Sequence, residues 1–199
     1  MITHNASDQS LGAPRQRPSE PSRTAYFVWI ALLALACVGG SFVLSCVMPF
    51  VALAIALAGT VRLGAAVKTM AIIWLTSQFV GFVFLHYPRT SNSVLWGLAI
   101  GMAALLSTLV ASMAIKRAAF LASMARLVVA FLLSYAVYEI ALGVAGLFLG
   151  SVDTFSPAII AQLAFVNFVW LVGLIVLNEL VVVVCKIWIG MPPRLARVQ

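Results

Sequence analysis

Charge is scarce in this chain, and acidic residues are the rarer charged type. Five Asp and Glu stand against 12 Lys and Arg among 199 residues, and only 9% of the chain is charged. Hydrophobic residues make up 64%, and the mean hydropathy is +1.13. A soluble domain of this size could not bury so much apolar surface. The composition therefore predicts a single-domain, multi-pass protein of the bacterial inner (plasma) membrane.

Motifs for nucleotide binding and hydrolytic chemistry are also absent. The chain has no P-loop, no H-E-x-x-H, no G-x-S-x-G and no dinucleotide-binding glycine pattern, which excludes an ATPase. Its three cysteines, Cys37, Cys46 and Cys185, lie in or beside apolar runs without C-x-x-C spacing. The two histidines complete no recognisable metal site with them. We expect reduced structural cysteines and no cofactor of the protein's own.

Six apolar runs predict an all-α bundle of six transmembrane helices, spanning 25–189 between two polar tails, a disordered one at 1–24 and one at 190–199. The first run, at 25–47, is too long for the hydrophobic region of a signal peptide. The others are expected at about 48–61, 66–85, 94–115, 127–149 and 157–189. The second is short for a bilayer, whereas the sixth is longer than a bilayer needs at about 1.5 Å per residue.

The distribution of basic residues predicts the orientation of these helices. With both termini in the cytoplasm, eleven of the twelve basic residues fall on the inner side and only Arg89 falls outside. This asymmetry follows the positive-inside rule. It explains the basic balance as membrane topology, so we expect lipids and not nucleic acid as partners.

Residues 74–101 carry most of the informative polar and aromatic side chains. Trp74 lies about eleven residues below the helix end at His86, too deep for an interfacial belt, so with Gln78 it predicts helix packing or a pocket wall. His86 and Tyr87 are either an interfacial pair or ligand contacts. Arg89 either clamps an anionic or amide-bearing group or pairs with Asp153.

Two glycines follow in the next apolar run. Gly97 and Gly101 are four residues apart, so they share one helix face and allow a neighbouring backbone to approach closely. We expect this face to form a helix–helix contact.

Two polar residues at membrane depth complete the candidate site. An ionisable group at the bilayer centre costs about 2.5 to 3.5 kcal/mol, so Glu139 is either a substrate or proton contact or a structural carboxylate bonded to another helix. Asn167 either faces the same interior or makes a helix–helix hydrogen bond. The sequence thus predicts an outer funnel in which Gln78, His86 and the more distant polar residues contact one ligand.

Residues 74–101 contain a pattern that reads Trp74-Leu75-x-x-Gln78-x-x-Gly81-Phe82-x-x-Leu85-x-Tyr87-Pro88, followed by Trp96-Gly97-x-x-x-Gly101. This pattern resembles the BtuM-like solitary cobalamin-type S-components of energy-coupling factor (ECF) transporters. The resemblance implies a six-helix subunit that is not itself an enzyme and that captures a vitamin, cobalamin or a related corrinoid, from the outer side. It also implies an ECF transmembrane coupling protein and ATPases as separate partners.

The chain departs from that family in two places. Some members are thought to ligate the corrin cobalt through a cysteine near the third span, but no cysteine lies between Cys46 and Cys185. His86 is the replacement that we expect as a cobalt ligand. The family's Ala-x-x-x-Ala coupling motif is absent from the first span, where Ala36-x-x-x-Gly40 is a weaker equivalent, although the second run contains Ala52-x-x-x-Ala56 and Ala54-x-x-x-Ala58.

Two other classes of protein remain open at this stage. One is an integral membrane enzyme acting on lipid or isoprenoid substrates, with Glu139, His86 and Asp153 as acid–base groups. Against it, the sequence shows no paired carboxylates and no spacing of a nucleophile with a base. The other is a non-catalytic scaffold or assembly protein, which needs only the small-residue faces and no pocket.

Overall fold

The computed structural model describes Ala31, residues 49–150 and residues 156–189, with side chains to 181 and at 183. Within these ranges the protein is helical and contains no strand. The predicted first span and both tails lie outside the described residues, except that Ala31 is helical. The described helices are α2 (Phe50–Thr60), α3 (Leu63–Val83), α4 (Ser91–Arg117), α5 (Ser123–Leu149) and α6 (Pro157–Ile189).

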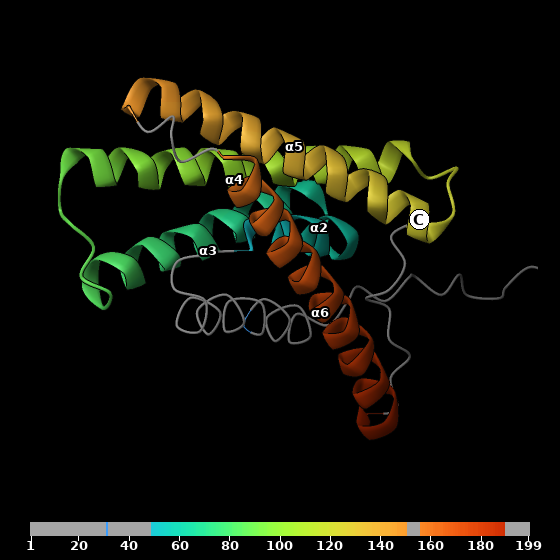
Figure 1. Cartoon of the computed structure of the whole chain (residues 1–199). Helices are drawn as coiled ribbons and strands as arrows, with labels where there is room; N and C mark the ends of the chain where they lie inside the picture. The colour runs from blue at the N-terminus through green and yellow to red at the C-terminus, as the bar shows by residue number, and fades with distance from the viewer. Residues whose placement is uncertain (1–30, 32–48, 151–155, 190–199) are drawn as a thin grey trace, which may run out of the picture.

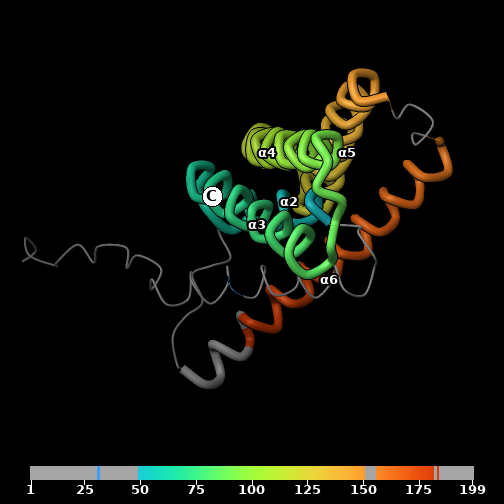
Figure 2. The backbone as a smooth tube through the Cα atoms, turned by 90° about the vertical axis from the view of Figure 1, so that its left-hand side faces the viewer, coloured from blue at the N-terminus to red at the C-terminus, as the bar shows by residue number. Residues whose placement is uncertain are grey.

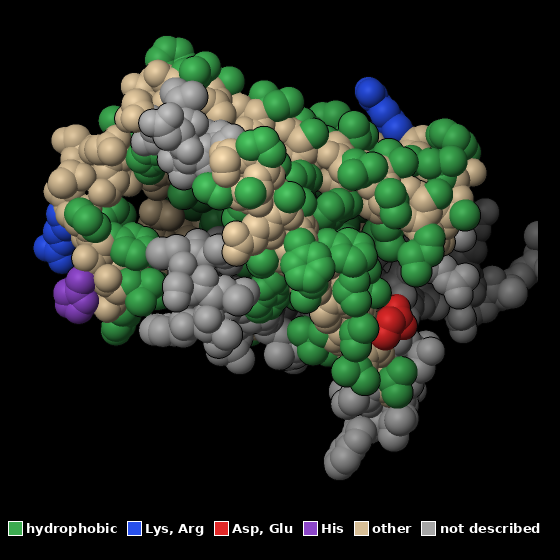
Figure 3. All heavy atoms as spheres, viewed as in Figure 1, with side chains coloured by type: hydrophobic (Ala, Val, Ile, Leu, Met, Phe, Trp, Pro, Cys, Tyr) green, Lys and Arg blue, Asp and Glu red, His purple; other side chains and the backbone are tan. Residues whose placement is uncertain are grey.

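Four of these helices, α3 to α6, are long and apolar enough to cross a membrane. They correspond to the predicted third to sixth spans and identify the chain as a membrane protein. Figure 3 shows hydrophobic side chains over much of this face, Lys or Arg (blue) and His (purple) at the end where α3 and α4 are joined, and a further blue group at the upper right. Large apolar side chains such as Phe79 (60% exposed) and Leu132 (59%) therefore have a lipid environment to face.

Helix α2, expected as the second span, is a buried core helix. Its 11 residues extend about 16 Å, roughly half of the hydrocarbon thickness of a bilayer. Residues 50–55 and Leu57 are at most 1% exposed, so α2 is covered on all sides and not along one face. Figures 1 and 2 show α2 in the middle of the bundle, where it contacts α3, α4, α5 and α6.

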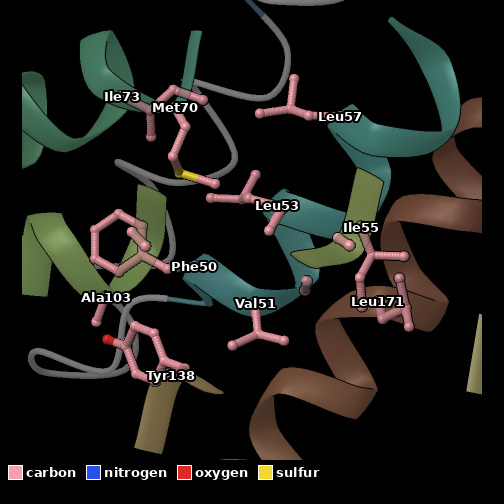
Figure 4. Packing of buried hydrophobic residues seen from close by; sticks show 14 of the residues in the cluster. Phe50, Val51, Leu53, Ile55, Leu57, Met70, Ile73, Ala103, Tyr138 and Leu171 are labelled. Atoms are coloured by element: carbon pink, nitrogen blue, oxygen red, sulfur yellow. The ribbon is translucent and has the colours of Figure 1, made fainter. Parts of the chain in front are cut away.

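The longer helices pack around this centre. Helices α4 and α5 lie side by side and make the most extensive contact in the bundle, while α6 runs obliquely to them (Figures 1 and 2). In Figure 4, Phe50 and Leu53 lie near Met70 of α3, and Ile55 lies beside Leu171 of α6. Ala103, Ala104 and Ala111 of α4 are fully buried, and their small side chains let the helices approach closely.

The alanine motifs of the second run are part of this core. Ala52 and Ala54 are fully buried within α2. Their burial leaves them no surface to offer a partner protein. Ala56 and Ala58, the second alanines of the two motifs, are only partly buried.

Helix α4 begins three residues earlier than predicted. Thr90 is its N-cap, and its hydroxyl oxygen accepts a hydrogen bond from the Ser93 backbone N–H at 3.2 Å. A threonine is well suited to satisfy an N–H of the first turn that has no helical partner. The polar run at 90–93, expected as a loop, is therefore the cap and first turn of the helix.

The two ends of α4 give a direct test of topology. The helix has 27 residues and is about 40 Å long, so Ser91, its first residue, and Ser123, the first residue of α5, are expected on opposite sides of the membrane. In a variant with Cys37, Cys46 and Cys185 replaced by alanine, Ser91→Cys should react with an impermeant maleimide in right-side-out vesicles. Ser123→Cys should react in inside-out vesicles. The opposite pattern would reverse the predicted orientation, and labelling of both from one side would mean that α4 does not span.

Candidate functional site

Trp74 and Gln78 lie in the contact between α3 and α4. The Trp74 indole Nε1 donates a hydrogen bond to the backbone oxygen of Gly97 at 2.9 Å. A Cβ atom at Gly101 would overlap the Trp74 ring, and one at Gly97 would meet the Gln78 amide oxygen at 2.5 Å. Two side chains of α3 thus pack against the glycine face of α4, and both take part in the contact between these helices.

The chain leaves α3 through a tight connection. The backbone N–H groups of Leu85 and Tyr87 donate to the oxygens of Val80 and Gly81, each at 3.1 Å. His86 between them has φ 54°, a left-handed conformation that is uncommon for a residue other than glycine. Such backbone persists only where the surroundings hold it, and it is concentrated at functional positions.

The Tyr87 ring secures this connection. It lies against Gly81, where an added Cβ would come within 2.5 Å of the ring, and it meets the Phe82 ring edge-on at 6.1 Å. The His86 and Arg89 side chains, in contrast, are exposed. The α3–α4 connection therefore has an anchored tyrosine and presents an imidazole and a guanidinium outward. Asp153, the expected partner of Arg89, lies outside the described residues.

Glu139 lies on α5, on the side where that helix meets the start of α6. Both of its carboxyl oxygens are buried and have no hydrogen-bond partner among the described residues. The Tyr135 hydroxyl, one turn earlier, is close enough to interact with Glu139, but it donates its hydrogen bond to the backbone oxygen of Ile160. A carboxyl group without a donor is costly at membrane depth, so Glu139 has the capacity to accept hydrogen bonds from a ligand.

Asn167 has a structural environment. It is 3% exposed, its Nδ2 donates to the Leu163 oxygen at 3.0 Å, and its Oδ1 accepts from the Ala52 N–H at 3.4 Å. Helix α2 begins inside the core at Pro49, which provides no side-chain cap. Asn167 thus satisfies a buried N–H of the first turn of α2 from another helix, which is the hydrogen-bonding alternative anticipated for it.

The predicted site residues accordingly fall into separate contacts. Trp74, Gln78, Gly97 and Gly101 share the α3–α4 interface, and the connection that follows holds His86, Tyr87 and Arg89. Among the described residues, no hydrogen bond or ring contact joins Trp74, Gln78 or His86 to Glu139 or Asn167.

An open groove between α4 and α5 has no counterpart in the sequence predictions. Its volume is about 420 Å³, and only apolar side chains line it, which suits a lipid acyl chain better than a water-soluble vitamin. Small residues facing large ones leave the space, a signal that the sequence carries only once the two helices are paired. The lining residues are Ala99, Met102, Leu106, Val137, Ile140, Ala141, Val144 and Ala145.

The part of the chain that the structure describes contains no cluster of three or more His, Cys, Asp or Glu side chains that could hold a metal ion. The role of His86 as a cobalt ligand stays a prediction. Fold and composition define an all-helical membrane protein. No family model, curated protein or solved structure matches the chain.

Proposed function

We propose that this chain is the substrate-binding membrane subunit of a vitamin uptake system. Its substrate is cobalamin or a related corrinoid, and it works with a separate ECF coupling protein and ATPases in the bacterial inner membrane. It has six helices, of which the short α2 lies buried among the others, and its termini are cytoplasmic. The observation that carries the proposal is the anchored α3–α4 connection, which presents His86 and Arg89 outward.

The anchoring matters because a ligand site gains affinity when it is organised before binding. The Trp74 indole ties α3 to α4, the Tyr87 ring rests on Gly81, and Thr90 caps the next helix. The connection is therefore held at both ends, and the imidazole and guanidinium it carries have little backbone freedom to lose. A neutral imidazole is a metal ligand, and a guanidinium donates to phosphate or amide oxygens.

Glu139 supports the proposal from the other side of the bundle. Corrinoids carry amide groups whose N–H groups are hydrogen-bond donors. The two buried carboxyl oxygens of Glu139 lack donors among the described residues. We expect the carboxyl group to accept such hydrogen bonds when substrate binds.

The proposal predicts that removing either outward side chain weakens corrinoid binding. His86→Ala and Arg89→Ala should each cost about 1 to 3 kcal/mol, roughly 5- to 150-fold in Kd, if each removes a desolvated hydrogen bond or ligand bond. Titration of aquocobalamin, followed by calorimetry and by its visible spectrum, measures both. Arg117→Ala is the matched control, since it removes an exposed cation at the other end of α4.

The possible results separate the assignment from the site. If the wild-type protein binds no corrinoid, the substrate class is wrong. If it binds and both variants bind equally well, His86 and Arg89 are not in the site. A spectral change on binding that His86→Ala abolishes would identify the imidazole as the cobalt ligand.

One observation favours the alternative of a lipid or isoprenoid substrate, namely the apolar α4–α5 groove. Its lining contains no acid–base side chain, so it could hold a chain but not act on it. This alternative would be preferred if a lipid co-purifies with the protein and the protein binds no corrinoid.

A further inference from the structure

The turn between α4 and α5 combines two exposed cations and a half-buried one with exposed apolar side chains. Lys116 and Arg117 end α4, and Arg126 lies in the first turn of α5. Between and beside them, Phe120 is 84% exposed and Met124 is 77% exposed. Lone apolar side chains on a surface need no explanation, but these two stand among three cations at the end of a membrane bundle.

These cations have no counter-charge close by in the chain. No Asp or Glu occurs anywhere between Glu20 and Glu139. Glu139 is 13 residues beyond Arg126, about 20 Å along α5, and the other described acidic residue, Glu179, lies on α6. Neither of them forms an ion pair with these cations. No described acidic side chain therefore neutralises the cations of this turn.

Helix electrostatics account for only part of the cluster. Lys116 and Arg117 stand in the last turn of α4, where a cation interacts favourably with the free carbonyl groups. Arg126 stands in the first turn of α5, where a cation is unfavourable, and that turn contains no acidic residue to offset it. An external anion would relieve this unfavourable placement.

We propose that the α4–α5 turn is a binding site for the headgroup of an anionic phospholipid. Lys116, Arg117 and Arg126 hold the phosphate, and Phe120 and Met124 enter the acyl boundary beside it. Basic groups next to a membrane helix attract anionic headgroups, and exposed apolar side chains at the same level add burial that a soluble anion cannot offer. This site does not depend on the proposed transport function.

Lipid titration of the purified full-length chain in detergent tests the site. Phosphatidylglycerol should raise the midpoint of thermal unfolding more than phosphatidylcholine at equal concentration, and the difference should shrink at high salt. Replacing Lys116, Arg117 and Arg126 together by Gln should weaken the apparent affinity for phosphatidylglycerol roughly tenfold or more. An unchanged midpoint in phosphatidylcholine shows that this variant is folded.

Two further arms make the result specific. Replacing Arg62, Lys68 and Lys186 by Gln removes the same total charge elsewhere and should leave the lipid preference in place. Phe120→Ser with Met124→Ser should weaken phosphatidylglycerol binding while leaving any response to inorganic phosphate unchanged.

Three outcomes would overturn the proposal. One is equal stabilisation by the two lipids. Another is an equal loss of affinity for phosphatidylglycerol in both charge variants, which would mean that only the net charge matters. The third is full stabilisation by inorganic phosphate, which would mean a site for a free anion.

Discussion

Replacing Gly101 by leucine is expected to prevent stable folding, because the space a side chain would need is filled by the indole of Trp74. Even a Cβ atom at Gly101 would overlap that ring. The ring cannot simply swing aside, since its Nε1 donates to the Gly97 oxygen across the same interface. Gly101→Ala should therefore lower the free energy of unfolding by about 1 to 3 kcal/mol. Leucine at both Gly97 and Gly101 should prevent the bundle from folding. Fluorescence-detected gel filtration reports whether the leucine variants fold, and thermal unfolding in detergent measures the stability of the alanine variant.

Other helical glycines supply matched controls. Gly143 in α5 and Gly173 in α6 have no atom within 4 Å of the Cβ that a substitution would add. Gly143→Ala and Gly173→Ala should therefore leave stability unchanged or raise it by about 0.5 to 1 kcal/mol through backbone entropy. Gly97→Ala should cost less than Gly101→Ala, since it displaces the flexible end of Gln78. If Gly101→Ala is as stable as Gly143→Ala, the close α3–α4 contact is wrong.

Hydropathy predicted the long helices well, for a simple reason. A run of 20 or more apolar residues has few alternatives to a transmembrane helix, and α3, α5 and α6 begin or end within a few residues of the expected positions. The same signal could not distinguish α2 from a span. A short helix buried on every side is as apolar all round as one that faces lipid on every side, and only the packing of α3 to α6 around it reveals the difference.

The candidate site was predictable only in part. The Gly97 and Gly101 spacing indicates a close helix contact, because both glycines fall on one face, but it does not name the side chains that fill it. The hydrogen bond between Asn167 and Ala52 joins residues 115 apart, and nothing local in either segment indicates the other. Glu139 was recognisable by its cost at membrane depth, yet its lack of a donor is a property of the surrounding helices.

Asn167→Leu is expected to destabilise the protein by about 1 to 3 kcal/mol, although leucine is the more apolar residue in a membrane bundle. The asparagine amide is nearly fully buried, and it accepts from the Ala52 N–H in the first turn of a helix that has no side-chain cap of its own. Leucine has the same branched shape, although it is bulkier, and it leaves that N–H without an acceptor in an apolar core, where an unsatisfied group bears its full desolvation cost. Thermal unfolding in detergent, without added ligand, measures the loss.

Gln162→Leu is the matched control, since Gln162 is an exposed amide on the same helix, five residues before Asn167. Its replacement should change stability by less than about 0.5 kcal/mol. Asn167→Asp keeps an acceptor for Ala52 but loses the Nδ2 donor to Leu163, so it should also be less stable than wild type.

Ligand titration then separates the two roles weighed for Asn167. If Asn167 is structural, folded Asn167→Leu protein binds corrinoid as wild type does. Unchanged stability together with weakened binding would instead assign the amide to the substrate.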